Sequence, residues 1–379
     1  MPLDRIEMLL LRLPYVRFFE TSFGRETDRT FIIVKASAGG LTGFGEVVAS
    51  QKPLYSYETT ETAWHVLKDF FIPLVLDSGL DDPAGFDRGV SRFRGHPMAK
   101  AGLGLALWDL EAKKRELPLW KVYGGGRSEI PAGVSVGIQD SPDELLERIG
   151  EFLDQGYQRI KIKIKPGWDI GMCETVRGRF PDILLQVDAN GAYTLDDRKT
   201  LTSLDRFGLL MLEQPFPPYD LWDHRLLQRR MRTPLCLDES ITSLTTARQA
   251  QEMGSCRVIN IKVGRVGGIG EARRIHDFCM DRDIPVWCGG MLESGIGRAH
   301  NIHLATLPNF RLPHDISASR RYYAEDIIDP AIEVSPRGTI AVPQGPGIGV
   351  SPLDSRIEKA ALRRQVFQRK SCGRTGSPS

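Results

Sequence analysis

This sequence lacks three features that mark other classes of protein. No apolar run approaches the roughly 18–20 residues that cross a membrane as a helix. Fifty Lys and Arg stand against 48 Asp and Glu, and this net charge of +2 argues against a nucleic-acid or membrane surface built on bulk charge. The first residues also lack the basic segment and the cleavage site of a signal peptide. We therefore expect a cytoplasmic protein without a nucleic-acid or membrane partner.

Cysteine is scarce, and no two cysteines form a C-x-x-C pair. The six are Cys173, Cys236, Cys256, Cys279, Cys288 and Cys372. Two of them stand inside apolar runs, so we predict reduced and mostly buried thiols. Apolar residues make up 41% of the sequence and charged residues 26%, which is typical of a globular protein with a sizeable core. A length of 379 residues suggests about two domains.

The first 126 residues predict an α+β domain, with strands followed by helices. IEMLLLRLP and TFIIVKASAGGLTGFGEVV have the apolar character of strands, the second with a Gly-Gly turn. Between them, residues 16–29 are polar but include Phe19 and Phe23, and we expect a loop that closes over a pocket. From about Tyr57 to Glu116 the apolar spacing is helical.

After Gly124–Gly126, short apolar runs alternate with amphipathic helical segments. This is the pattern of a repeating βα unit and a parallel sheet. Eight such runs follow one another: AGVSVGI, IKIKI, ILLQVDANG, LLMLEQP, PLCLDES, VINIKV, PVWCGGM and LPHDIS. Eight strands are enough to close a (β/α)₈ TIM-type barrel, which we place at residues 127–325. An open doubly wound sheet is the alternative, and residues 369–379 are predicted to be a disordered tail.

Five ionisable residues recur with the period of this repeat. Lys163, Asp188, Glu213 and Asp238 are each 25 residues apart, and Lys262 follows after 24. Each stands at or near the carboxyl end of its apolar run. In a barrel these ends form one mouth, where active sites lie, whereas an open sheet would spread the five groups along an edge. We therefore expect them to converge on one site.

The three carboxylates among these residues predict a metal site. Converging carboxylates repel one another unless a cation lies among them. Oxygen ligands favour a hard ion, and a site open to water and substrate favours Mg²⁺ over Ca²⁺. We predict that Asp188, Glu213 and Asp238 hold Mg²⁺, for which Mn²⁺ or another divalent cation is a substitute. The alternative is that each carboxylate caps a helix or forms a local ion pair.

The lysines predict acid–base chemistry. Lys161 and Lys163 alternate along one strand and so face the same way, into an interior where a charge is costly without a partner or a role. Lys262 ends the sixth strand, which faces the second across a barrel of eight. Removing a proton α to a carboxylate produces an enediolate, which a metal ion stabilises. We expect a lowered lysine pKa, which would suit a base near neutrality.

At these residues the sequence resembles the enolase superfamily, muconate-lactonising-enzyme subgroup. Within it, the closest resemblance is to the o-succinylbenzoate synthase / N-succinylamino acid racemase (N-acylamino acid racemase) family. The stretches that carry this resemblance are RIKIKIKPGWD, QVDANGAYTL, CLDES, NIKVGRVGG, PVWCGGMLESGIGRAHN and SASRRYY. The resemblance implies a barrel topped by an α+β capping domain, with residues 326–368 returning to the cap. It also implies a small-molecule carboxylate substrate with a succinyl or acyl group, and we expect a homo-oligomer.

Carried over by position, the resemblance also assigns roles. It implies that Lys163 and Lys262 are the acid–base pair and that Asp188, Glu213 and Asp238 are the Mg²⁺ ligands. Lys161 would lie near the substrate carboxylate. Arg265 stands three residues after Lys262, and from this position alone it either helps to keep that lysine neutral or is a solvated loop arginine. The implied pocket residues are Ser135, Asn190, Gly290, Met291, Ser317, Phe19 and Phe23.

The sequence departs from its relatives at Val263, where they are expected to have proline. Two alternatives lose support, because PVWCGGM lacks the histidine of acid-sugar dehydratases and Asp315-Ile-Ser317 lacks the second aspartate of dipeptide epimerases. A dipeptide epimerase, a muconate-type cycloisomerase or a non-catalytic scaffold remain alternatives. His300 and His303 have no evident third ligand, so we expect a surface or core role for both. Whether the cell uses the dehydration of o-succinylbenzoate synthesis, in menaquinone biosynthesis, or the racemisation stays open.

Overall fold

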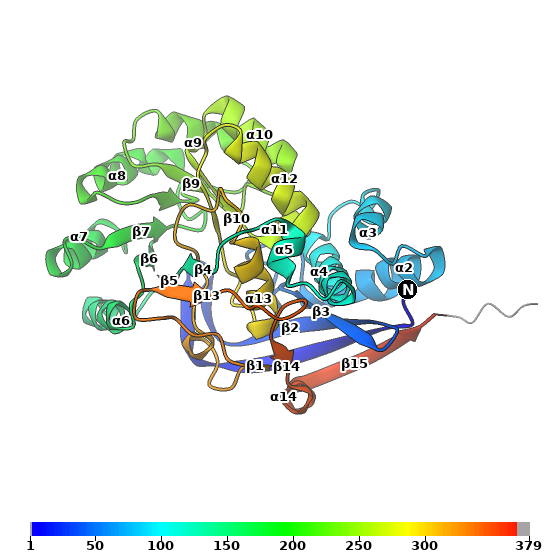
Figure 1. The fold of residues 1–379 in the computed structure, drawn as a ribbon. Helices are drawn as coiled ribbons and strands as arrows, with labels where there is room; N and C mark the ends of the chain where they lie inside the picture. Colours follow the sequence, from blue (N-terminus) through cyan, green and yellow to red (C-terminus); the bar gives the residue numbers. More distant parts are fainter. Residues whose placement is uncertain (1, 370–379) are drawn as a thin grey trace, which may run out of the picture.

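The computed structural model describes residues 2–369 (Figure 1). An antiparallel sheet runs along one side of the molecule in the order β15-β1-β2-β3. Its strands are β1 (Arg5–Thr21), β2 (Gly24–Ala38), β3 (Leu41–Val47) and β15 (Ala361–Gln368). Strand β15 comes from the far end of the chain and pairs with β1, so the last described strand completes the sheet that the first strand begins.

Helices cover one face of this sheet. They are α1 (Thr60–Val66), the π-helical turn η1 (Leu67–Phe71), α2 (Ile72–Ser78), α3 (Pro83–Val90) and α4 (Pro97–Lys114). The short helix α5 (Leu119–Tyr123) follows, and its buried side chains belong to the core of the second part of the chain. The long helix α4 lies directly on β3, where Gly43 and Gly45 permit the contact. A Cβ at either position would lie 2.1 Å from a carbonyl oxygen of α4. The sheet and these helices enclose a hydrophobic core of their own.

The second part of the chain is a parallel barrel, as the repeating βα pattern predicts. Its sheet has the order β11-β10-β9-β8-β7-β6-β5. The strands are β5 (Gly133–Val136), β6 (Arg159–Lys163), β7 (Leu184–Asp188), β8 (Leu212–Glu213), β9 (Leu235–Leu237), β10 (Val258–Ile261) and β11 (Val286–Cys288). The eighth position is taken by residues 310–315, where Phe310 bridges to Val286 of β11 and His314 bridges to Ala132 beside β5. These two parallel bridges close the barrel.

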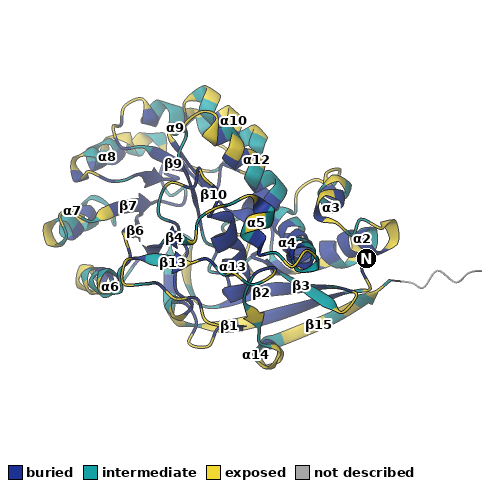
Figure 2. Cartoon of the chain, in the orientation of Figure 1, coloured by how far each residue is buried: buried dark blue, intermediate teal, exposed yellow. Residues whose placement is uncertain are grey.

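Helices surround the barrel, and most of them have a buried inner face and an exposed outer face, whereas the helices at Val263–Val266 and Gly295–Leu304 are buried throughout (Figure 2). They are α6 (Pro142–Asp154), α7 (Ile170–Arg179), α8 (Arg198–Ser203), α9 (Leu221–Gln228), α10 (Leu244–Met253), α11 (Val263–Val266), α12 (Ile269–Met280) and α13 (Gly295–Leu304), with the 3₁₀ turns η2 (Leu195–Asp197), η3 (Leu204–Phe207) and η4 (Ser319–Arg321). None of the helices in residues 2–369 is both long and apolar enough to cross a membrane.

The chain then returns across both parts of the molecule. The remaining elements are β4 (Glu129–Pro131), β12 (Ile328–Asp329), β13 (Thr339–Ala341), β14 (Ser351–Pro352) and α14 (Asp354–Ala360). Strand β13 pairs with β4 at the entry to the barrel, and only β15 joins the antiparallel sheet. The division of the chain at residue 126 stays a prediction. Of the predicted tail, Arg369 pairs with Asp81, and the rest lies outside the described residues.

The structure corrects the prediction for residues 16–29, which form the end of a β-hairpin rather than a loop. Strand β1 continues to Thr21 and β2 begins at Gly24, with a break in register between Pro14 and Phe19. The segment is polar, but aromatic residues favour strands, and residues 19–21 pair with residues 24–26 of the facing strand. We call residues 16–29 the hairpin end.

Candidate active site

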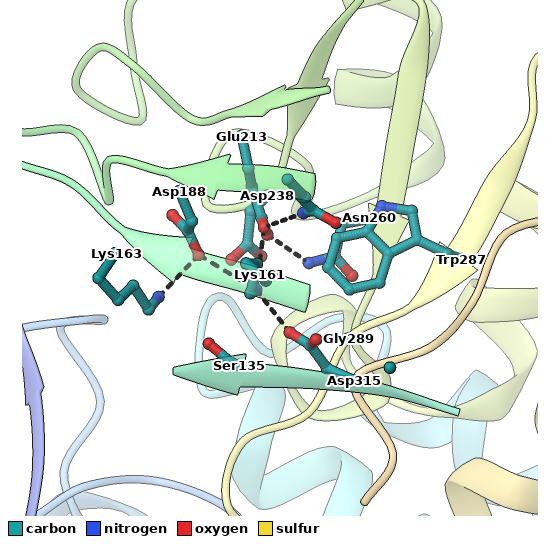
Figure 3. Close-up of polar contacts among 12 residues, drawn as sticks. Ser135, Lys161, Lys163, Asp188, Glu213, Asp238, Asn260, Trp287, Gly289 and Asp315 are labelled. Carbon is teal, nitrogen blue, oxygen red and sulfur yellow. Dashed lines mark hydrogen bonds and ion pairs between the residues drawn. The ribbon is translucent and has the colours of Figure 1, made fainter. Parts of the chain in front are cut away.

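The five periodic residues meet at the carboxyl ends of the barrel strands, and Figure 3 shows all of them except Lys262 by label. Lys163, Asp188 and Glu213 are the last residues of β6, β7 and β8, and they lie side by side in register. Asp238 and Lys262 directly follow β9 and β10. All five side chains are buried, with exposed fractions between 0% and 7%.

Two of the lysines contact opposite ends of the row of carboxylates. The Lys163 Nζ lies 2.7 Å from Asp188 Oδ2 and 2.6 Å from Asn190 Oδ1. The Lys262 Nζ lies 2.8 Å from Asp238 Oδ2. An ammonium group therefore flanks the row on each side, from strands that face each other across the barrel.

Lys161 lies between the two and contacts three carboxylates. Its Nζ is 3.1 Å from Asp188, 2.9 Å from Glu213 and 2.5 Å from Asp315. Burial alone would lower the pKa of Lys161, but these carboxylates together raise it above its ordinary value. The pKa of Lys262 is raised in the same way. The lowered lysine pKa expected from the sequence depends on a neighbouring cation as well as on desolvation, and it stays a prediction.

The carboxylates have the donor chemistry for a hard divalent cation, although they do not yet surround one. Within residues 2–369 no three acidic, histidine or cysteine side chains are arranged to hold a metal ion. Asp188 and Glu213 accept from Lys161, and Asp238 accepts from Lys262 and Arg265. Buried oxygen atoms without a partner flank the row, namely Glu239 Oε2, Gln186 Oε1 and Asn260 Oδ1. This all-oxygen set has the donor chemistry that Mg²⁺ prefers.

Arg265 and Tyr55 complete the surroundings of Lys262. Arg265 lies in the short helix α11 and donates to the same Asp238 carboxylate that Lys262 contacts. The Tyr55 hydroxyl donates to Asp238 at 2.9 Å and lies 3.2 Å from Lys262 Nζ. Burial lowers the pKa of Arg265, which nonetheless faces a buried carboxylate. Lys262 therefore shares its counterion with a second cation.

A cavity of about 410 Å³ opens above this layer, between the barrel and the hairpin end. Of the residues predicted for the site, its lining contains Phe19, Phe23, Ser135, Lys161, Lys163, Asn190, Lys262, Gly290 and Met291. Ser317 is not part of the lining. It is buried, and its hydroxyl donates to the Gly133 carbonyl at 3.4 Å.

Several residues of the site were not predicted. Gln186 and Asn260 each donate to Glu213, at 2.7 and 2.8 Å. Both stand two positions before a predicted site residue on the same strand, so strand alternation could have found them. Burial raises the pKa of Glu239 to about 7, and Glu239 accepts from Asn190 at 2.9 Å. Nothing in the sequence around Tyr55 marks it as a site residue.

The histidines and the described cysteines considered in the sequence lie outside the candidate site. His300 and His303 lie buried on α13, where each contacts a backbone carbonyl, of Phe44 and Ile348 respectively. Burial lowers the pKa of both to about 4. Five of the six cysteines are free thiols, and the sixth, Cys372, lies outside the described residues.

Comparison with known families covers most of the chain. Residues 144–356 match the enolase C-terminal domain-like family, and residues 6–124 match the mandelate racemase / muconate lactonizing enzyme N-terminal domain. The chain is 50% identical over 352 residues to an o-succinylbenzoate synthase of Geobacillus kaustophilus, covering 93% of this chain and 94% of that protein. It is 47% identical over 362 residues to an N-succinylamino acid racemase of Thermus thermophilus, covering 96% and 98%.

Solved structures agree with these matches. A crystal structure of an enolase-superfamily member from Listeria innocua is similar with a TM-score of 0.93 and 40% identity, over 97% of this chain and all of that chain. A dipeptide epimerase from Cytophaga hutchinsonii, complexed with Mg and a dipeptide, shares the fold with a TM-score of 0.86 and 23% identity, over 97% and 100%.

Proposed function

The chain belongs to the mandelate racemase / muconate lactonizing enzyme family of the enolase superfamily, and we propose that it is an enzyme with two related activities. One is the dehydration that forms o-succinylbenzoate, and the other is the racemisation of N-succinylamino acids. Relatives 45–50% identical to the chain bear one name or the other. The observation that carries the proposal is the placement of Lys163 and Lys262 at opposite ends of one row of buried carboxylates.

Both reactions begin with the removal of a proton α to a carboxylate. In racemisation, one lysine takes the proton from one face of the substrate, and the other lysine delivers a proton to the opposite face. In dehydration, the same intermediate expels its hydroxyl group, and the lysine that took the α-proton returns this proton to the departing oxygen, which leaves as water. Lys161 and Ser135 line the cavity, and the Ser135 hydroxyl has no partner among the described residues, so both would orient the substrate carboxylate. Arg265 forms an ion pair with the same Asp238 carboxylate that Lys262 contacts, so it adds a positive charge beside Lys262.

Asp188, Glu213 and Asp238 would hold the divalent cation, which we propose to be Mg²⁺. When bound, it supplies Lewis-acid stabilisation of the negative charge that develops on the substrate carboxylate. The residues that would hold it are buried and carry only oxygen donors. We also propose a cytoplasmic location, supported by the free cysteines, and a homo-oligomer, which stays a prediction.

The experiment offers the purified protein, with Mg²⁺ and separately with EDTA, the cyclohexadiene precursor of o-succinylbenzoate and an N-succinylamino acid. We expect absorbance changes for dehydration and loss of optical activity for racemisation, both abolished by chelation and restored by Mg²⁺. Exchange of the α-proton in D₂O, followed by NMR, detects proton removal even if turnover stalls. Activity on neither substrate and no exchange would exclude the proposal. Genes for menaquinone synthesis beside this one would favour the synthase, and an acyltransferase or acylase gene the racemase.

A further inference from the structure

Buried cations in this protein almost always have a buried carboxylate beside them. The buried lysine and arginine side chains are Arg29, Arg159, Lys161, Lys163, Lys262, Arg265 and Arg298. Six of them lie within 4.0 Å of an Asp or Glu oxygen. Arg29 is the exception, because no carboxylate of residues 2–369 forms an ion pair with it. A buried charge without a counterion is costly, so its retention needs a reason.

The contacts of Arg29 hold its guanidinium in place without neutralising it. Arg29 lies on β2, and only 4% of its surface is exposed. Its Nη1 donates to the Ser50 hydroxyl at 2.7 Å, and its Nη2 donates to the Val48 carbonyl. The Nε has no acceptor among the described residues, and the hydroxyl of the neighbouring Thr30 is also unpaired. The described residues therefore hold the group in position by neutral acceptors alone.

Arg29 is also part of the wall of the active-site cavity. Arg29, Thr30 and Ser50 line it from the side of the antiparallel sheet, whereas Lys161 and Lys163 line it from the barrel. The other arginine of the lining, Arg25, already contacts Glu20 and Asp140. A molecule that fills the cavity thus meets a fixed cation that forms no ion pair within residues 2–369, on the side of the antiparallel sheet.

We propose that Arg29 binds the second carboxylate of a dicarboxylate substrate, the free end of a succinyl group. This inference rests on the proposed function, and it assigns the recognition of the succinyl group to one residue. A substrate carboxylate beside Arg29 would form charge-assisted hydrogen bonds with the guanidinium and act as its counterion. The carboxylate next to the reacting carbon then lies at the lysines, and the two anionic ends fix the substrate across the cavity.

The test compares two substrates that differ only in this charge. They are the N-succinyl derivative of an amino acid and its N-succinamoyl analogue, in which a neutral amide replaces the free carboxylate. We expect the wild-type enzyme to racemise the succinyl substrate with a kcat/KM on the order of 10- to 100-fold higher. In Arg29→Met this advantage should shrink to about twofold, because only the succinyl substrate loses an interaction. Arg17→Met, which removes an exposed arginine of the same hairpin outside the lining, should keep the wild-type ratio.

The outcomes separate this inference from the proposed function. If Arg29→Met slows both substrates equally, Arg29 has a structural role and the inference is wrong. If the wild-type enzyme does not distinguish the substrates, the inference is wrong whether or not the variant folds. Arg29→Lys keeps the charge and should retain part of the preference, mostly as a lower KM for the succinyl substrate. A wild-type enzyme inactive on both N-acyl substrates and on the dehydration substrate contradicts the proposed function instead.

Discussion

Lys163 and Lys262 each contact a different aspartate, so removing either one should disable one face of the substrate. We expect Lys262→Ala to lower racemisation by at least about 100-fold, because one face then lacks its proton donor. In D₂O this variant should still exchange the α-proton of one enantiomer and not of the other. Lys163→Ala should exchange the opposite enantiomer and should also lose dehydration. Enantiomer-resolved proton NMR gives both rates.

The control for the two lysine variants is a lysine far from any proposed role in the reaction. Lys359→Ala removes a lysine whose side chain is 80% exposed, and it should behave as the wild type. If Lys262→Ala racemises at the normal rate, the two-base scheme is wrong.

Val263 stands where a proline would fit without strain. It is the first residue of α11, a position that proline favours, and its N–H donates to no acceptor in the described part of the chain. Lys262 before it has φ −118° and ψ 118°, which the residue before a proline prefers. Val263→Pro should therefore raise the free energy of unfolding by about 0.4–1 kcal/mol, measured in urea, and leave kcat unchanged.

Val266→Pro is the matched control, because the N–H of Val266 donates to the Lys262 carbonyl at 3.1 Å. It should cost about 3 kcal/mol. A Val263→Pro protein that is destabilised to a similar degree would contradict the prediction.

The residues of the site that the sequence could predict are those that share the period of the barrel. Asp188, Glu213 and Asp238 stand at equivalent strand ends, so spacing alone brings them together. Tyr55 and Arg29 come from the antiparallel part, where no repeat relates them to the barrel. Their place in the site depends on how the two parts pack, which local sequence does not encode.

At the scale of elements, the hairpin end owes its position to contacts with the barrel. The Glu20 carbonyl accepts from the Ile138 N–H at 2.9 Å, and the Val16 N–H donates to the Tyr322 carbonyl at 2.8 Å. The sequence predicted that this segment covers a pocket, because polar residues enclose its phenylalanines. It did not predict strands, since their pairing depends on a partner strand and its register.

Gly137 permits the close approach of the hairpin end, and a side chain there should displace it. A Cβ on Gly137 would lie 2.8 Å from the Glu20 carbonyl oxygen and 2.9 Å from its nitrogen, both backbone atoms. Because Phe19 and Phe23 line the cavity from this hairpin, Gly137→Ala should raise KM and lower kcat/KM by about tenfold or more. The free energy of unfolding, measured in urea, should fall by about 1–3 kcal/mol, as at other overpacked sites.

Gly150→Ala serves as the control, since a Cβ on that residue of α6 meets no atom within 4 Å. It should leave KM unchanged and stabilise the helix slightly. An unchanged KM in Gly137→Ala would show that the hairpin end does not set substrate affinity.

At the scale of the whole molecule, eight apolar runs predicted the barrel because a closed parallel sheet needs each strand buried on both sides. The eighth run is the least regular, and residues 310–315 bridge to both neighbours without a continuous ladder. Pro313 lies in this run and has no N–H to donate. The return of the chain to β1 followed from resemblance alone, since β15 is a mostly exposed edge strand without a distinctive pattern.

His303 joins the two parts of the molecule in a way that makes the contact sensitive to acid. Its Nδ1 accepts from the Trp120 N–H at 3.2 Å, and its Nε2 contacts the Ile348 carbonyl at 3.0 Å. The ring must therefore be neutral, with its proton on Nε2. Burial lowers its pKa from 6.5 to about 4. The unfolded chain thus takes up a proton at a higher pH than the folded protein, and this contribution to stability is present above pH 6.5 and is lost as the pH falls towards 4.

His303→Gln should remove this dependence while keeping one of the two hydrogen bonds. At pH 8 the variant should be less stable than the wild type by about 1–2 kcal/mol, because one buried hydrogen bond is lost. Below pH 6.5 the difference should shrink by about 1.4 kcal/mol per pH unit, since only the wild type must keep a histidine neutral. Buried acids such as Glu58, whose pKa burial raises to about 7, shift stability in the opposite sense, so the difference between the two proteins is the quantity to measure. A constant difference between His303→Gln and the wild type across the same range would mean that His303 does not titrate with folding.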